Sequence, residues 1–356
     1  MFRLIAEEDD DQRRLDRILR KHLPALPLSS LHRLIRKGKI TVNGKAALPG
    51  IRVRRGQAIE IPDSAMNGQI QSRENQGPPG AVKDRSFPQG KEDFSAKTPG
   101  ENDFPLLKIL FEDSGLLVLN KPAGIAVHGP QSLEEQVLAY LKPRLAPSLS
   151  FRPGPLHRLD KPTSGILIFS TSLMGARYFS ALLRERKIRK QYLAIVDGII
   201  EGAHTWNDLL ARDEGQQKTF GSENFGISNE KSKNAQTMVR ALANAPGHTL
   251  ILAEIKTGRT HQIRAQCSLH GRPLSGDRKY GGKDFPTGPR DLLLHAWKLR
   301  LEGPSSPPPF LSEHPQCLAD GISAPLPPDF QRRICHLFGE DTLRKLVGGY
   351  SPFAFT

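Results

Sequence analysis

The stretch from residue 63 to residue 105 most constrains the fold, because it cannot form a hydrophobic core. Gly, Pro, Ser, Gln, Asn and charged residues dominate it, and no apolar periodicity persists along it. That composition predicts a flexible linker. The 356-residue chain is therefore expected to fold in separate parts. These are a small module at 12–62, a larger domain at 106–335 and a C-terminal tail at 336–356.

The pattern of residues 12–62 predicts a small α/β module. Apolar residues recur at helical spacing over residues 15–23 and again over 31–35. Asn43-Gly44 follows, and this pair is the strongest short signal for a hairpin turn. Alternating apolar residues over 51–61 then predict strands that complete the module.

The chain is strongly basic, with 51 Lys and Arg against 37 Asp and Glu and a net charge of +14. That excess indicates a polyanionic partner, most simply a nucleic acid, with a membrane surface as the competing partner. No apolar run is long enough to cross a bilayer, so we expect no membrane-spanning segment. In the small module, basic residues cover the polar faces of both predicted helices, among them Arg17, Arg33, Arg36 and Lys37. The alternative for these four residues is a solvated helix face.

The larger domain predicts an α+β fold with a mixed, mostly antiparallel sheet. Its expected strands are short and its helices are interspersed without strict alternation. The strands are expected at 116–119, 166–170, 192–196, 235–240, 249–255 and 292–301. Residues 202–232 are expected to form a long polar loop or a poorly ordered hairpin.

One carboxylate, Asp160, lies in a Pro/Thr/Ser/Gly turn just before the apolar run 166–169. A carboxylate held at the edge of a strand is accessible and pre-positioned, which suits catalysis. An Asp in such a turn also commonly bonds to the local backbone and has no chemical role. The residues alone leave both interpretations open.

Several further segments, taken together, resemble a known family. His157 to Gly165 matches the H-R-L-D-x-x-T-S-G signature of the RluA-type pseudouridine synthases. The other matching segments, in the family's order along the chain around that signature, are Lys121 to His128, Gly258 to Arg264, Gly276 to Gly281, His295-Ala296 and Ala324 to Phe330. The resemblance therefore covers about residues 106–302 and a short closing segment.

That resemblance implies an enzyme that isomerises uridine to pseudouridine within RNA. The reaction involves no net redox change, no hydrolysis and no group donor, so no cofactor and no metal are expected. Asp160 is implied to be the essential carboxylate, acting either as a nucleophile at the anomeric carbon or as a base on the ribose 2′ proton. Arg264 is implied to pair with Asp160, whose carboxylate a planar guanidinium can hold bidentately, and Tyr192 to pack against the target base.

The RNA-binding residues come partly from the same resemblance. Arg158 is expected to contact RNA phosphate or to hold the site open, and Lys121 to be structural or to face RNA. Residues 12–62 separately resemble the small RNA-binding domain of ribosomal protein S-four, on Arg14-Leu15-Asp16, the basic second helix and Val42-Asn43-Gly44. Such a domain implies large-subunit ribosomal RNA as the substrate, with transfer RNA as the alternative.

Two other function classes compete with a pseudouridine synthase. An RNA-binding assembly factor with a vestigial site is disfavoured because Asp160, Tyr192 and Arg264 are all retained. A nucleoside or glycoside hydrolase needs a second carboxylate, and the Asp160 segment contains none. The three widely spaced cysteines indicate neither a disulfide framework nor a zinc site, so we expect a cytoplasmic protein. We also expect the protein to act as a monomer.

Overall fold

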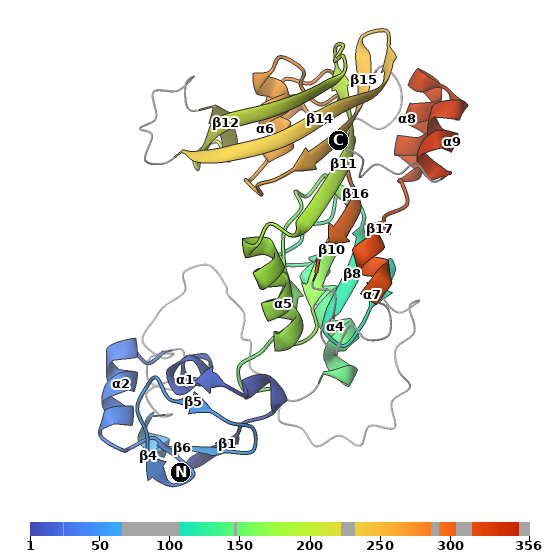
Figure 1. Ribbon diagram of the computed structural model, residues 1–356. Coiled ribbons are helices and arrows are strands. Elements are labelled where there is room, and N and C mark those ends of the chain that lie inside the picture. The colour runs from blue at the N-terminus through green and yellow to red at the C-terminus, as the bar shows by residue number, and fades with distance from the viewer. Residues whose placement is uncertain are drawn as a thin grey trace. The chain divides into compact units, whose positions relative to one another are not determined.

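The protein folds into two compact units, seen here in a computed structural model (Figure 1). The structure describes residues 1–23, 25–65, 107–145, 148–221, 232–285, 292–303 and 315–348. Most of the expected linker at 63–105 lies outside these residues, and the domain boundaries stay predictions. Among the described residues, 141–145, 148–153 and 172–174 belong to the first unit with residues 1–65. Buried Asp10 contributes to this grouping, because its carboxylate accepts a hydrogen bond from the N–H of Leu149 (2.8 Å).

The first unit is a small sheet packed on two helices. The strands β1 (Phe2–Ile5), β6 (Ala58–Ile61), β3 (Thr41–Val42) and β4 (Lys45–Ala46) form an antiparallel sheet in that order. The other elements are η1 (Glu8–Asp10), β2 (Arg13–Arg14), α1 (Leu15–His22), α2 (Leu28–Arg36) and β5 (Arg52–Val53), and β2 pairs with β5. The expected hairpin turn is confirmed, because Asn43 and Gly44 both have positive φ (50° and 72°) between β3 and β4.

The second unit is built on one large mixed sheet. Its main strand order is β13 (Lys218–Gly221), β12 (Ala203–Asp213), β14 (Lys233–Ala245), β15 (His248–Ile255), β11 (Ile188–Asp197), β16 (Leu294–Leu301), β10 (Ser164–Ser170), β8 (Leu116–Lys121) and β7 (Ile109–Glu112). The short strands β9 (Gly154–Pro155) and β17 (Ile322–Ser323) pair with β10 and β16. Only β10 and β16 run parallel among the described pairs, so the expected mostly antiparallel sheet is confirmed.

Helices cover both faces of this sheet (Figure 1). The remaining elements are α4 (Leu133–Leu141), η3 (Lys142–Arg144), α5 (Leu173–Arg184), α6 (Gln262–Leu269), η6 (Arg278–Tyr280), α7 (Pro315–Asp320), α8 (Pro328–Phe338) and α9 (Glu340–Val347). The helices α8 and α9 bury Phe330 and Leu346 against Leu193 of β11. On the opposite face, Gln266 of α6 accepts a hydrogen bond from the hydroxyl of Thr237 on β14 (2.6 Å). The two faces of β11 therefore have different surroundings.

Residues 202–232 were expected to form a long polar loop or a poorly ordered hairpin, and the structure contradicts the first of these. A polar loop is wrong for residues 203–221, because β12 and β13 pair as an antiparallel hairpin at the edge of the sheet. Trp206 of β12 is buried between the exposed polar residues Thr205 and Asn207, and a segment buried mostly on one face has few apolar residues. Residues 222–231 lie outside the described part of the chain. The expected boundary at 335/336 falls inside α8.

Candidate active site

A cleft of about 670 Å³ lies on the second unit's sheet, on the face that carries Tyr192. Its walls are the Asp160 turn, the end of α5, strand β11 and the loop that enters α6. Among the described residues that line it, eight are Lys or Arg and two are carboxylates, Asp160 and Glu302. Besides Arg158 and Arg264, the cationic residues are Arg184, Arg186, Arg189, Lys190, Lys256 and Arg259. The excess of positive charge suits a polyanionic substrate.

The turn that presents Asp160 is fixed by the residues that follow it. The N–H of Thr163 donates to the Asp160 carbonyl (3.0 Å), and β10 then begins at Ser164 beside β16. Gly165 has φ +108°, and a Cβ there would lie 2.2 Å from the Ala296 carbonyl oxygen. Only glycine permits this close approach of the two parallel strands. The T-S-G part of the motif therefore holds the carboxylate at the mouth of the cleft.

Lys121 was expected to be structural or to face RNA, and its burial excludes the second of these roles. Its side chain is fully buried, and its ammonium donates to the carbonyls of Pro122 (2.8 Å), Ile125 (2.7 Å) and Lys161 (3.1 Å). Burial lowers the pKa of Lys121 to about 8, while the charge of Asp160 acts in the opposite direction. The ammonium joins the loop after β8 to the residue next to Asp160. Lys121 is a positioning residue, and a buried group of this kind cannot contact an RNA phosphate.

Arg264 lies beside Asp160, but its closest partner is Asp277. Nη1 of Arg264 is 3.4 Å from Oδ2 of Asp160. Nε and Nη2 donate to the two carboxylate oxygens of Asp277, at 2.7 and 2.8 Å. Arg264 therefore pairs with Asp160 as expected, but through one nitrogen only, because Asp277 occupies the fork of the guanidinium. Both side chains of this pair are buried.

Two further residues complete the surroundings of Asp160. Nε2 of His261 is 3.8 Å from Oδ2 of Asp160, and its Nδ1 is 2.9 Å from the Tyr280 hydroxyl. That hydroxyl accepts the N–H of Thr219 (2.9 Å), so its own hydrogen is available to donate to Nδ1. Burial lowers the pKa of His261 and Asp160 opposes the shift, which leaves the ring neutral near pH 7. The Tyr280 ring also covers the guanidinium of Arg264, at 4.9 Å.

Tyr192 faces the same cleft from β11. It is buried, and burial raises the pKa of its hydroxyl, with the charge of Asp160 adding to the shift. The tyrosine is therefore neutral across the physiological range. The structure thus brings Asp160, Arg264 and Tyr192 together around one cleft, as the sequence led us to expect. Their roles in catalysis stay predictions.

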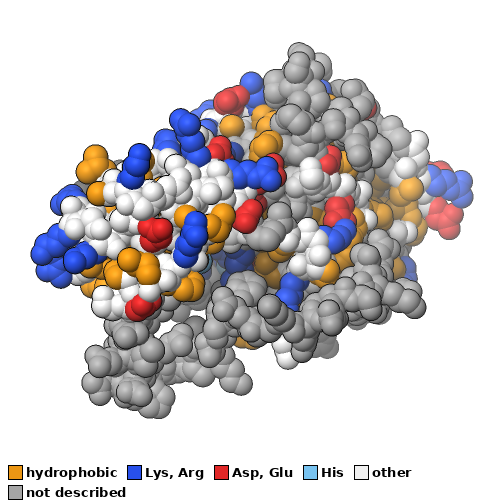
Figure 2. All heavy atoms as spheres, turned by 90° about the horizontal axis from the view of Figure 1, so that it is seen from below, with side chains coloured by type: hydrophobic (Ala, Val, Ile, Leu, Met, Phe, Trp, Pro, Cys, Tyr) orange, Lys and Arg blue, Asp and Glu red, His pale blue; other side chains and the backbone are white. Residues whose placement is uncertain are grey.

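The remaining expected RNA-binding residues are exposed. Arg158 lines the cleft with its side chain exposed, whereas Arg17, Arg33, Arg36 and Lys37 are exposed on the helices of the first unit. Figure 2 shows Lys and Arg side chains spread over the face of that unit that is turned toward the viewer. Exposure permits binding to RNA and does not by itself establish it.

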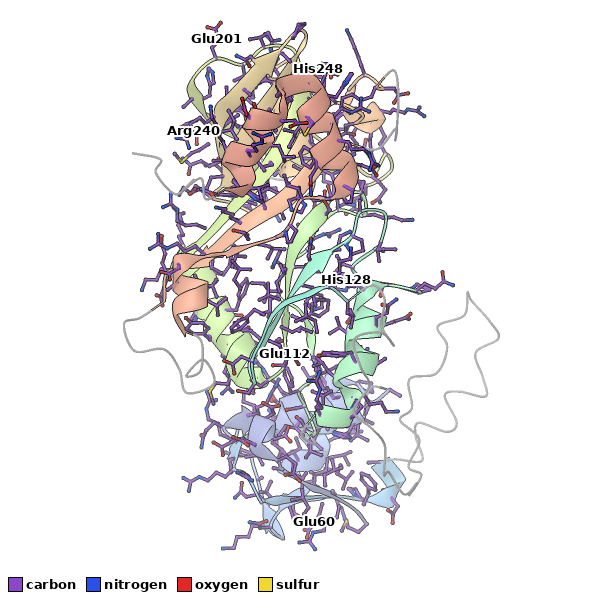
Figure 3. All side chains as sticks on the ribbon, turned by 90° about the vertical axis from the view of Figure 1, so that its right-hand side faces the viewer. Glu60, Glu112, His128, Glu201, Arg240 and His248 are labelled. Atoms are coloured by element: carbon purple, nitrogen blue, oxygen red, sulfur yellow. The ribbon has the colours of Figure 1, made fainter. Side chains whose placement is uncertain are left out.

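His128, the last residue of the matching segment Lys121 to His128, does not line the cleft. It lies on the loop before α4, distant from the end of the sheet that carries Arg240 and His248 (Figure 3). Its Nδ1 pairs with Glu134 at 2.8 Å. His128 therefore has a local partner at the start of α4.

Sequence reasoning assigned no role to Asp277 or Tyr280, which hold Arg264 and His261. Both lie in the Gly276 to Gly281 segment that matches the family, and this match was the only available signal. Within the described ranges, no group of three or more His, Cys, Asp or Glu is arranged to hold a metal ion. The helices in those same ranges include none long and apolar enough to cross a membrane.

Comparisons with known proteins find relatives that match most of this chain. A family model described as RNA pseudouridylate synthase matches residues 115–269, and an S4 domain matches residues 13–59. The chain is 31% identical over 315 residues to the ribosomal large subunit pseudouridine synthase C of Haemophilus influenzae, across 85% of this chain and 88% of the relative. Identity to the protein of that name from Haemophilus ducreyi is 32%, across 84% and 87%.

Among solved structures, human RNA Pseudouridylate Synthase Domain Containing 4 is 23% identical, with a TM-score of 0.49. The match covers 64% of this chain and 91% of the human chain. The extent and identity of the bacterial matches show that the chain belongs to the RluA-type pseudouridine synthases and carries an N-terminal S4 domain. The protein is accordingly an RNA pseudouridine synthase, an isomerase.

Proposed function

We propose that this enzyme isomerises uridines in large-subunit ribosomal RNA and that Asp160 is its essential carboxylate. The observation that carries the proposal is the position of Asp160, a carboxylate beside Arg264 in a cation-rich cleft that Tyr192 also lines. The names of the bacterial relatives, all ribosomal large subunit pseudouridine synthase C, support this choice of RNA. That substrate also agrees with the cytoplasmic location expected from the sequence.

The chemistry requires one bond to break and another to form on the same nucleotide. The bond from the ribose anomeric carbon to N1 breaks, the base turns, and the ribose bonds to C5. The proton on C5 is lost and N1 gains one, so that atoms and electrons balance without a cofactor. Asp160 acts first either as a nucleophile at the anomeric carbon or as a base at the 2′ position. In both cases the reacting group is the carboxylate of Asp160, and Arg264 places a cation beside it.

Tyr192 and the basic surfaces have supporting roles in this proposal. Because the target base must leave the RNA stack to reach Asp160, an aromatic ring beside the carboxylate is a suitable surface for it. Arg158 is exposed at the cleft and would contact the RNA there, whereas the cations of the first unit would bind RNA elsewhere. We also propose that the enzyme acts as a monomer, as expected from the sequence.

The choice of substrate is tested with unmodified transcripts. Purified protein is incubated without added cofactor with a transcript of large-subunit ribosomal RNA or with a pool of transfer RNA transcripts, and pseudouridine is quantified in nucleoside digests. The proposal predicts pseudouridine in the ribosomal transcript alone. Conversion of transfer RNA alone would contradict the proposed substrate. If the protein binds both RNAs and converts neither, it acts as an RNA-binding assembly factor under these conditions.

A further inference from the structure

The cations on the two faces of strand β11 differ in whether they have a counter-charge within the protein. Arg189 and Gln191 point to the face of Glu254, since Gln191 lies directly opposite Glu254 in the register with β15. Glu254 is fully buried and accepts from Nε and Nη2 of Arg189 (3.1 and 3.2 Å) and from Nε2 of Gln191 (3.0 Å). Nζ of Lys256 donates to it as well (2.7 Å). Both cations of this face therefore have a counter-charge within the protein.

Lys190 points to the opposite face, with Ile188 and Tyr192, and lines the cleft. Its ammonium passes beside Gly258, whose Cβ, if present, would lie 4.0 Å from Nζ. Gly258 belongs to the loop that leads to Arg264, so the ammonium lies beside this wall of the cleft. Across the ranges that the structure describes, Lys190 has neither a hydrogen-bond acceptor nor an ion-pair partner.

A partly buried ammonium without a partner is unfavourable, because it loses hydration and gains no counter-charge. Burial alone lowers the pKa of Lys190, and no neighbouring carboxylate opposes that shift. The comparison with Lys121 is informative, since that buried ammonium has three carbonyl acceptors. The missing partner of Lys190 is therefore to be found in a ligand that enters the cleft.

The position of Lys190 indicates which part of the ligand it meets. Lys190 and Tyr192 are two residues apart on one strand, so their side chains stand about 7 Å apart on the same face. In the proposed function Tyr192 packs against the target base. The base is joined through its ribose to phosphates on either side, and these anions would lie near Lys190.

We propose that Lys190 is a phosphate-binding residue of the cleft, whose ammonium binds a backbone phosphate beside the target uridine. This inference rests on the proposed RNA substrate and adds to it a named subsite. A phosphate supplies the anionic oxygens that the fold does not, and a lysine binds it as a point charge.

The test is the salt dependence of RNA binding. Dissociation constants of the full-length protein for a large-subunit ribosomal RNA transcript are measured from low to high KCl for wild type, Lys190→Gln, Lys190→Arg and Lys345→Gln. Losing one phosphate contact should reduce the slope of log K against log salt by about 0.7 and weaken binding about tenfold at low salt. Lys190→Arg should retain most of the slope. Lys345→Gln is the control and should retain it as well, because this lysine is exposed on α9 and does not line the cleft.

A stability measurement separates this role from a structural one. Lys190→Met keeps the apolar stem and removes a charge that has no partner in the described structure, so its Tm should equal or exceed that of wild type. A Tm several degrees lower would show that Lys190 supports the fold and would overturn the inference. A slope of log K against log salt for Lys190→Gln equal to that of wild type would also overturn the inference, provided that wild type converts the same transcript. Failure of wild type to convert any transcript would instead count against the proposed function.

Discussion

Arg264 donates two hydrogen bonds to Asp277 and turns only its third nitrogen toward Asp160. Asp277 does not line the cleft, so it acts on the reaction only through the position of this guanidinium. A buried bidentate pair fixes the plane of the guanidinium, and the Tyr280 ring covers one side of it. Asp160 thus has a cation beside it at 3.4 Å without being held by its fork.

Asp277→Asn is expected to slow the chemical step with little effect on RNA binding. The neutral amide cannot hold the guanidinium in the same position, and a displacement of about 1 Å near reacting groups can cost about 100-fold in rate. Single-turnover reactions with enzyme in excess give the rate constant, and their amplitude gives the active fraction. The exposed Asp284→Asn is the control. An Asp277→Asn rate constant equal to that of wild type would show that Asp277 does not position Arg264.

Lys121→Met is expected to destabilise the fold. Three backbone carbonyls lose their donor, which should lower the free energy of unfolding by about 2–4 kcal/mol. Urea unfolding measures the change. Lys161 is a nearby lysine with an exposed side chain. Its replacement by Met should change the free energy of unfolding by no more than about 0.5 kcal/mol. If Lys121→Met kept full stability and lost RNA affinity instead, Lys121 would be an RNA ligand after all.

The basic helix of the first unit is expected to contribute to affinity and not to chemistry. Replacing Arg33, Arg36 and Lys37 together by Gln should weaken binding of the ribosomal transcript and reduce the salt slope by about 2. The single-turnover rate constant at saturating enzyme should stay unchanged. Lys345→Gln, an exposed change on α9, controls for net charge. Unaltered affinity in the triple variant would remove this helix from the RNA interface.

Acid should destabilise the protein partly through His295. This fully buried ring accepts from or donates to Ser164 at 2.8 Å, and burial lowers its pKa to about 4. Between pH 6.5 and 4 the unfolded chain binds a proton that the folded ring refuses. The stabilisation is therefore complete above pH 6.5 and is lost as pH falls, by about 2 kcal/mol at pH 5. Urea unfolding at pH 7 and pH 5 should show a smaller loss for His295→Gln, whereas equal losses would contradict this origin.

The sequence predicted the elements with a clear period and the residues of the named motifs. It placed the Asn43-Gly44 turn and the mixed sheet correctly, because these depend on local residue pattern. It failed where the decisive neighbour is distant along the chain. Asp277 and Lys121 both lie in segments that match the family, but only the fold shows that Asp277 occupies the fork of Arg264 and that Lys121 donates to three carbonyls. The regular strand β12 could not be told from a polar loop or a poorly ordered hairpin, because few of its residues are buried.

Asp160→Asn tests the proposed chemistry most directly. Wild type, Asp160→Asn and Asp284→Asn are each mixed in excess with a large-subunit ribosomal RNA transcript, and pseudouridine is quantified over time alongside the dissociation constant. We expect Asp160→Asn to bind the transcript within about threefold of wild type, since a neutral amide of similar size replaces the carboxylate, and to form no pseudouridine. Formation of pseudouridine by Asp160→Asn at a rate near that of wild type would contradict the role given to this carboxylate.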